Sequence, residues 1–209
     1  MRNIQQILLA GAVLLASAGS GVRADEIDPA DRARAETIAV TVCGTCHGTD
    51  GNSIQPKFPR LAGQNANYLA AQLKAFRAQT RGDPDAIAYM WGMASQLDDT
   101  TISALAAYYA AQKPEAGSRG DQAAITRGRE IYDHGISAEG VPACSSCHGT
   151  DAHGMQDFPR LASQHAQYVL KQLASFQSNM RKVAIMHGVA QNLRVPEMES
   201  VAAFLQSQP

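Results

Sequence analysis

The stretch Cys-Gly-Thr-Cys-His-Gly-Thr at residues 43–49 returns almost unchanged as Cys-Ser-Ser-Cys-His-Gly-Thr at residues 144–150. Two cysteines three positions apart bring their sulfur atoms side by side on one turn, where they can add to the two vinyl groups of a haem. The histidine that follows then reaches the iron as an axial ligand. This pattern is the attachment signature of haem c, and two copies predict two covalently bound haem c groups.

Three other uses of the cysteines compete with haem attachment. A zinc site needs four ligands, and each half of the chain offers one cysteine pair, so the metal would have to bridge the halves. A thioredoxin-like redox pair expects a βαβ setting, which the sequence lacks. Structural disulfides are open to exported cysteines, but this tight spacing joins nothing distant. Haem is favoured, and the residues predicted to hold it are Cys43, Cys46 and His47, and Cys144, Cys147 and His148.

The duplication extends over most of the chain. Phe-Pro-Arg-Leu-Ala at residues 58–62 returns at residues 158–162, and Met-Trp-Gly at residues 90–92 is matched by Met-His-Gly at residues 186–188. Such a repeat indicates two copies of one fold. Apolar residues within each copy recur at helical spacing and no segment alternates like a strand. We therefore predict an all-α protein made of two tandem domains, each a small helical fold wrapped around its haem.

Local composition and helix-capping residues indicate the domain boundaries. Residues between Lys113 and Gln122 are rich in proline, glycine and charge, which is typical of a linker. We expect a first domain over residues 25–114, a linker over 115–122 and a second domain over 123–209. Asp28, which precedes a proline, and Asp98 are predicted to cap the first and last helices of the first domain.

The N-terminus has the features of a secretory signal. Arg2 precedes an apolar run from Ile7 to Ala18, and Ala24 ends a small-residue cleavage site. A membrane anchor is the alternative, but spanning a bilayer takes about 20 apolar residues. We expect cleavage after Ala24 and location in the periplasm, where free cysteines are exceptional. The remaining chain is mildly acidic, which argues against nucleic acid as a partner.

The second axial ligand is sought among the methionines. Met90 and Met186 both lie seven residues before a leucine, Leu97 in one copy and Leu193 in the other. A ligand position shared by two copies should hold the same residue in both, so we predict Met90 and Met186. Met93, three residues further on, is the alternative in the first domain. Gap filling in a core is the expected role of Met93, Met155 and Met198.

These motifs resemble those of the class I cytochromes c, and their tandem arrangement resembles cytochrome c4. The resemblance implies that Pro59 and Pro159 offer their carbonyl oxygens to the haem histidines, which makes a histidine a better donor to iron. It also implies that the first and last helices of a domain cross through a glycine and aromatic residues. Gly128, Tyr132 and Phe204 fit this in the second domain, whereas the first has alanine and isoleucine in the comparable helix.

Three pairs of polar residues also repeat between the copies. Haem propionates are anionic and costly to bury without partners, so arginine or tyrosine near them is one interpretation. The other is that these side chains face water or bridge the two domains. The pairs are Arg60 and Arg160, Gln64 and Gln164, and Tyr68 and Tyr168.

Histidine and methionine together fill both axial positions of an iron. Such an iron has no open position for oxygen or peroxide, and methionine raises its reduction potential. We therefore expect an electron carrier and not an enzyme. Redox partners should dock weakly and briefly through small interfaces. The expected partners are a membrane oxidase, a quinol-oxidising complex or other cytochromes, and peripheral association with a membrane is compatible with these.

The resemblance to cytochrome c4 implies delivery of electrons toward a terminal oxidase of a respiratory chain. Two alternatives remain open. One is the cytochrome subunit of a periplasmic dehydrogenase that acts on sulfide, thiosulfate or an alcohol. The other is a dihaem peroxidase, although that requires one haem with an open position, which equivalent methionines in both halves argue against.

Overall fold

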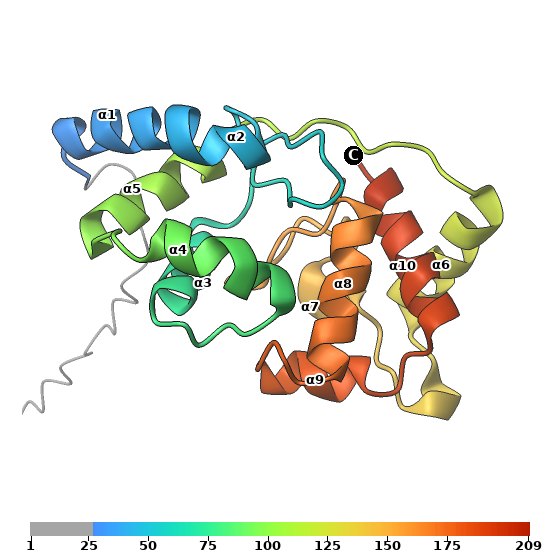
Figure 1. The fold of residues 1–209 in the computed structure, drawn as a ribbon. Coiled ribbons are helices and arrows are strands. Elements are labelled where there is room, and N and C mark those ends of the chain that lie inside the picture. Colours follow the sequence, from blue (N-terminus) through green and yellow to red (C-terminus); the bar gives the residue numbers. More distant parts are fainter. Residues whose placement is uncertain (1–26) are drawn as a thin grey trace, which may run out of the picture.

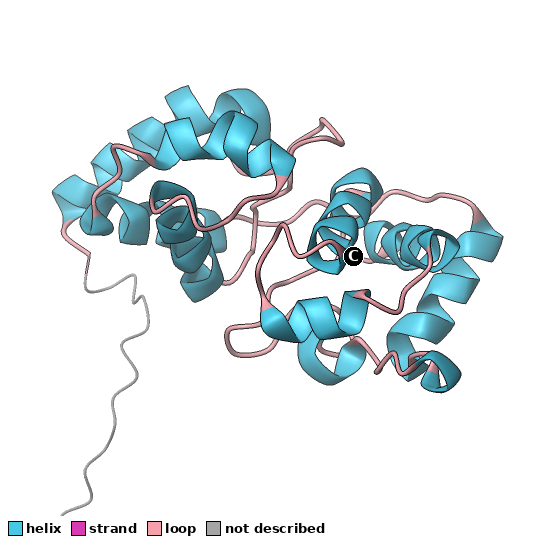
Figure 2. Ribbon diagram, turned by 60° about the horizontal axis from the view of Figure 1, so that its bottom comes forward, coloured by secondary structure: helices cyan, strands magenta, loops and turns pink. Residues whose placement is uncertain are grey.

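The computed structural model describes residues 27–209, which form two helical units that follow one another along the chain (Figure 1). The signal predicted over residues 1–24 lies outside the described residues. Within residues 27–209 the chain alternates between helices and loops and forms no strand, apart from one isolated β-bridge between Ile136 and Val141 (Figure 2). The predicted all-α fold of two tandem units is confirmed.

The first unit runs from α1 to α5. The Asp28 side chain caps α1 by accepting a hydrogen bond from the Ala30 N–H at 2.8 Å, and Asp98 caps α5 through the Thr101 N–H at 2.7 Å. Both caps agree with the sequence analysis. The elements are α1 (Pro29–Ile38), a π-helical turn (Ala39–Cys43), α2 (Gly44–His47), α3 (Ala66–Arg77), a second π-helical turn (Ala86–Met90), α4 (Trp91–Ala94) and α5 (Asp99–Ala110).

The second unit runs from α6 to α10. Residues 113–121 have no helical structure, and Asp121 caps α6 so that this helix begins at Gln122, the last residue of the expected linker. The elements are α6 (Gln122–His134), a short 3₁₀ turn (Ser137–Glu139), α7 (Ser145–His148), α8 (Ala166–Gln177), α9 (Ala184–Ala190) and α10 (Val195–Ser207).

In the second unit α6 crosses α10 at very close range. A Cβ atom on Gly128 would lie 2.0 Å from the Ser200 carbonyl oxygen, so only glycine fits there. One turn further along, the fully buried Tyr132 ring packs against Phe204 with ring centroids 5.2 Å apart. The Tyr132 hydroxyl donates a hydrogen bond to the Gly149 carbonyl oxygen at 2.6 Å. The crossing is the one that the resemblance implied, and through Tyr132 it also supports the loop that directly follows His148.

The first unit makes the same crossing with different residues. Ala35 and Ala39 of the first helical segment are buried against α5, whose Ile102 and Tyr109 are also buried. In the second unit the tyrosine at the crossing comes from α6, whereas in the first unit it comes from α5. This residue is Tyr109, whose hydroxyl donates a hydrogen bond to the Ala39 carbonyl oxygen at 3.3 Å. The comparable alanine noted in the sequence leaves room for this exchange. The crossing is thus present in both units.

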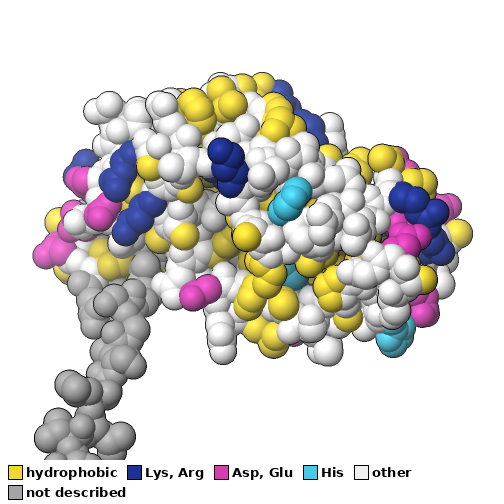
Figure 3. Space-filling model, turned by 90° about the horizontal axis from the view of Figure 1, so that it is seen from below, with side chains coloured by type: hydrophobic (Ala, Val, Ile, Leu, Met, Phe, Trp, Pro, Cys, Tyr) yellow, Lys and Arg dark blue, Asp and Glu magenta, His cyan; other side chains and the backbone are white. Residues whose placement is uncertain are grey.

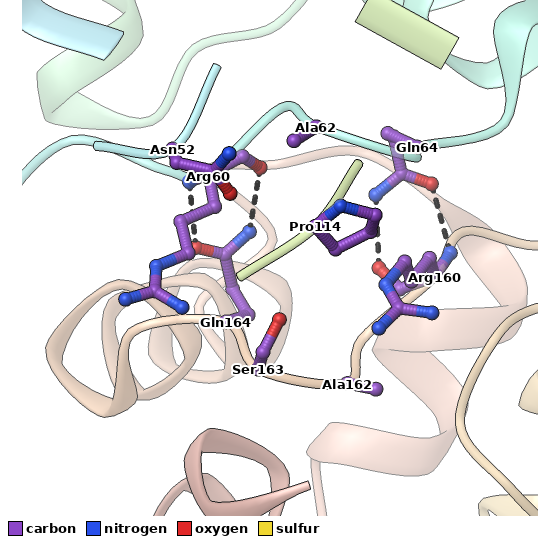
Figure 4. A pocket seen from close by; sticks show the side chains of 9 residues that line it. All are labelled: Asn52, Arg60, Ala62, Gln64, Pro114, Arg160, Ala162, Ser163 and Gln164. Atoms are coloured by element: carbon purple, nitrogen blue, oxygen red, sulfur yellow. Dashed lines mark hydrogen bonds between the residues drawn. The ribbon is translucent and has the colours of Figure 1, made fainter. Parts of the chain in front are cut away.

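Two glutamines join the units by reciprocal contacts. The Gln64 side-chain oxygen accepts from the Arg160 backbone N–H at 2.8 Å, and its nitrogen donates to the Arg160 carbonyl oxygen at 2.8 Å. Gln164 makes the matching pair of bonds to the backbone of Arg60 at 2.9 and 3.0 Å (Figure 4). The two halves of this clamp are related by the same duplication that relates the units. For these glutamines the bridging interpretation is therefore correct.

A second set of interface contacts surrounds two buried arginines. Arg181 donates to the hydroxyl of Tyr68 at 2.8 Å, and Arg81 donates to the hydroxyl of Tyr168 at 3.3 Å. Each tyrosine thus meets the arginine of the other unit. The symmetry is broken by Asp83, which pairs with Arg81 at 2.7 Å and has no counterpart in the second unit. The two arginines and Asp83 are almost completely buried, so their pairing fixes how the units sit together.

Candidate haem-binding sites

Each haem histidine is buried at the end of a short helix and held by one hydrogen bond. His47 Nδ1 lies 2.9 Å from the Pro59 carbonyl oxygen, and His148 Nδ1 lies 3.1 Å from that of Pro159. A carbonyl oxygen only accepts, so Nδ1 carries the hydrogen and Nε2 keeps its lone pair. Burial lowers the pKa of both histidines, while the bond to proline opposes this. The rings are therefore neutral donors whose free nitrogen suits a metal.

The cysteines lie on the same turns as the histidines. All four thiols are free and partly buried. Burial raises the pKa of Cys43, and it raises the pKa of Cys144 to about 11, so these sulfurs carry protons at neutral pH. In the first unit the Gly44 N–H bonds the Ala39 carbonyl oxygen, which closes the π-helical turn that ends at Cys43. Such turns occur frequently at functional sites.

The methionines differ in their surroundings. Met90 ends the second π-helical turn and is partly buried beside Phe76, Ala86 and Ala94. Met93, one turn further on, is 58% exposed. Met186 lies on α9, is partly buried, and packs against the core of the second unit.

The residues present fit two haem c groups. In each unit an unpaired cysteine pair lies beside a histidine whose Nε2 is free to bind iron, and a partly buried thioether is available as a second ligand. Sulfur and imidazole are the ligands that cytochromes use for haem iron. Among residues 27–209 no three histidine, cysteine or acidic side chains gather as a metal-ion site. The zinc alternative therefore has no ligand set in this part of the chain.

Comparison with known proteins agrees with this geometry. The profile of the cytochrome c family matches residues 32–112 and again residues 125–209. The solved structure of cytochrome c4 from Acidithiobacillus ferrooxidans superimposes with a TM-score of 0.75 at 43% sequence identity, covering 79% of this chain and 98% of that one. The chain belongs to the dihaem cytochrome c4 family.

As a member of the cytochrome c4 family, the chain carries two covalently bound haem c groups and transfers electrons. It is similar to a cytochrome c-552 of Acidithiobacillus ferridurans, with 42% identity over 79% of this chain and 73% of that protein. It is also similar to a thiosulfate dehydrogenase electron acceptor of Thiomonas intermedia, with 32% identity over 100% of this chain and 92% of that protein.

The structure adds residues to this cytochrome c4 site that the sequence analysis did not single out. Arg81 and Arg181 are buried at the junction of the units, and each stacks on a phenylalanine of its own unit, with 4.7 Å and 4.6 Å to the ring centroids of Phe76 and Phe176. Their signal was present in the sequence, since an arginine stands at the same place in both copies. It was missed because the copies diverge directly after it.

The remaining repeated arginines have protein partners. The Arg60 guanidinium donates to the Ala116 carbonyl oxygen at 3.4 Å, and that of Arg160 donates to the Pro209 carbonyl oxygen at 2.8 Å. His165 is buried, and its Nε2 bonds the Ser53 carbonyl oxygen of the other unit at 2.8 Å. These contacts join the linker, the last helix and the two loops that follow the haem histidines.

Proposed function

We propose that this chain is a periplasmic electron carrier of a respiratory chain, which passes electrons toward a terminal oxidase. In the proposed ligand set, His47 and Met90 bind the first iron, and His148 and Met186 bind the second. Cys43 and Cys46, and Cys144 and Cys147, would form the thioether bonds. The proposed domain limits are residues 25–114 and 123–209 with a linker between them, preceded by a cleaved signal.

The observation that carries this proposal is that both units offer the same kinds of side chain where the proposed ligands lie. In each, a neutral histidine is fixed by a proline carbonyl, and a partly buried methionine is available on the segment before the last helix. When bound, a haem iron with both axial positions filled can gain and lose one electron with little rearrangement. A peroxidase would need one unit to differ, and the two histidine sites are alike.

The protein orients the histidines and excludes water from the interior of each unit. The proline carbonyls hold each imidazole at a fixed tautomer and angle, which would make it a better and more constant donor to a bound haem iron. The crossing of α6 with α10 and that of α1 with α5 hold the loops behind the histidines. Buried apolar clusters in each unit exclude water, and the reciprocal glutamine clamp keeps the two units at one separation.

Partner docking is supported by apolar surface near the proposed methionines. Ile87 and Met93 are exposed in the first unit, and Val183 and Ile185 in the second. Hydrophobic side chains also gather on the face seen from below in Figure 3, with charged groups scattered between them. Small apolar patches with a polar surround suit brief encounters between redox proteins. No helix within residues 27–209 is long and apolar enough to cross a membrane.

Reoxidation of the reduced protein by a membrane oxidase tests this function. Reduced holoprotein is added to membranes of the source organism, and its reoxidation is followed by absorbance with and without cyanide. We expect rapid, cyanide-sensitive reoxidation that slows at high salt if charged groups steer docking. Absence of cyanide-sensitive reoxidation would refute delivery to an oxidase.

A second candidate function is that of electron acceptor for a thiosulfate dehydrogenase. It is favoured by the likeness to the Thiomonas intermedia acceptor, which extends over the whole of this chain. Thiosulfate and the purified dehydrogenase of the same organism should then reduce this protein, and the two should purify together. If only donors other than the thiosulfate dehydrogenase reduce this protein, the role of electron carrier to an oxidase is the better description.

The methionine ligands have their own test. Met90→Ala and Met186→Ala should each remove the methionine ligand from one iron. That haem should then bind carbon monoxide when reduced and lose its methionine-to-iron charge-transfer band. Met93→Ala is the matched control and should leave both irons with their methionine ligands, because the Met93 side chain is exposed. If Met93→Ala opens the first haem and Met90→Ala does not, the ligand is Met93.

A further inference from the structure

In the first unit, three side chains connect the loop after His47 to the segment that carries Met90. The Lys57 ammonium donates a hydrogen bond to the Tyr89 hydroxyl. The Phe58 ring meets the Tyr89 ring edge to face, with centroids 5.6 Å apart and planes at 79°. Phe58 also lies 6.1 Å from the His47 ring. We call Lys57, Phe58 and Tyr89 the Tyr89 clasp.

The second unit lacks this clasp although it keeps one of its parts. Phe158 lies 6.0 Å from the ring of His148, as its counterpart does in the first unit. The position of Lys57 is taken by Asp157, which accepts a hydrogen bond at 3.1 Å from Asn67 across the interface. The position of Tyr89 is taken by Ile185, which is 55% exposed. The second unit is therefore an internal control within the same molecule.

We propose that the Tyr89 clasp is a positioning device that keeps Met90 on the first haem iron and resists its replacement by a foreign ligand. The proposal rests on the ligand assignment made above. Tyr89 is the residue directly before Met90, so a movement of this segment that withdraws the methionine would carry the ring off Phe58 and break the bond to Lys57. A foreign ligand that needs this movement would therefore bind less well.

The size of the effect follows from the contacts that opening would break. An edge-to-face aromatic pair contributes beyond its buried area, and its loss corresponds to a change of about fivefold in an opening equilibrium. The hydrogen bond from Lys57 adds to this, although both partners are partly exposed. We therefore expect about a fivefold change in the affinity of the first iron for a competing ligand, in one unit only.

Imidazole, a neutral ligand that competes with methionine for ferric haem, is the probe. The oxidised holoprotein is titrated with imidazole, and the methyl resonances of the two ligand methionines are followed by NMR after assignment with Met90→Ala and Met186→Ala. Tyr89→Ile installs the residue of the second unit. It should raise the imidazole affinity of the first haem about fivefold and leave that of the second haem unchanged. Tyr89→Phe keeps the ring contact and should give a smaller rise.

The reciprocal variant builds the clasp where it is absent. Asp157→Lys combined with Ile185→Tyr should lower the imidazole affinity of the second haem and leave the first unchanged. The inference is wrong if Tyr89→Ile leaves the first haem's affinity as it was, or if it alters both haems equally. If Met90→Ala removes neither methyl resonance, the ligand assignment is wrong, and the inference falls with it. An unchanged affinity with Met90 confirmed as ligand refutes the inference alone.

Discussion

Replacing Gln64 with leucine would remove half of the clamp that joins the two units. The Gln64 side chain is buried and makes two bonds of 2.8 Å to the backbone N–H and carbonyl oxygen of Arg160. It also accepts from the Asn65 N–H at 2.9 Å. Leucine has a similar size and cannot form any of these bonds. The variant therefore leaves polar backbone groups of both units without partners inside the interface.

The magnitude follows from those unpaired groups. A buried donor or acceptor that loses its partner costs about 1–3 kcal/mol. Two groups on Arg160 therefore give an expected loss of about 2–6 kcal/mol in the free energy of unfolding of the holoprotein. Gln164→Leu should cost a similar amount, because Gln164 makes the same pair of bonds to Arg60.

Guanidinium unfolding of the holoprotein, followed by circular dichroism and haem absorbance, measures the loss. Gln122→Leu is the matched control, since Gln122 is exposed on α6 and makes only a 3.4 Å contact with Thr126. It should change the unfolding free energy by less than about 0.5 kcal/mol. A loss below that value for Gln64→Leu, or a large difference between Gln64→Leu and Gln164→Leu, would show that the clamp does not hold the units together.

Three further predictions concern packing, pH and processing. Gly128→Ala should destabilise the protein by about 1–3 kcal/mol in guanidinium unfolding, because α10 leaves no room for a methyl group, whereas Gly188→Ala on α9, with open space around it, should not. Burial would raise the pKa of Asp83, but the hydrogen bond and charge of Arg81 outweigh it and hold this pKa below its ordinary value. The stability from this pair is thus present above about pH 4 and is lost as the pH falls, so Asp83→Asn should flatten the acid side of a stability–pH curve. N-terminal sequencing of the exported protein should begin directly after Ala24, and a chain that keeps its first residue would favour the membrane anchor.

Much of the fold could be predicted because local signals agreed with one another. The caps at Asp28 and Asp98 each depend on a few neighbouring residues, and the structure has both. The close crossing at Gly128 was implied by family resemblance, and the structure forms it. The bonds of the haem histidines to Pro59 and Pro159 were implied by family resemblance, and the structure forms them as well. The ligand methionines remain a prediction.

The contacts between the units were harder to predict. Repetition marked Gln64 and Tyr68 as special, but it could not tell a haem-facing side chain from one that crosses to the other unit. That distinction depends on how the two units are oriented, which no local pattern encodes. The π-helical turns that end at Cys43 and Met90 were also missed, because one extra residue in a helical turn leaves the apolar spacing almost unchanged.

The mass of the denatured mature protein tests the central claim most directly. Thioether bonds survive denaturation, so a chain that attaches haem at both Cys43/Cys46 and Cys144/Cys147 should retain two haems per molecule in mass spectrometry. Cys144→Ser together with Cys147→Ser should reduce this to one. A mass equal to that of the polypeptide alone, with the cysteines oxidised to disulfides, would contradict the account.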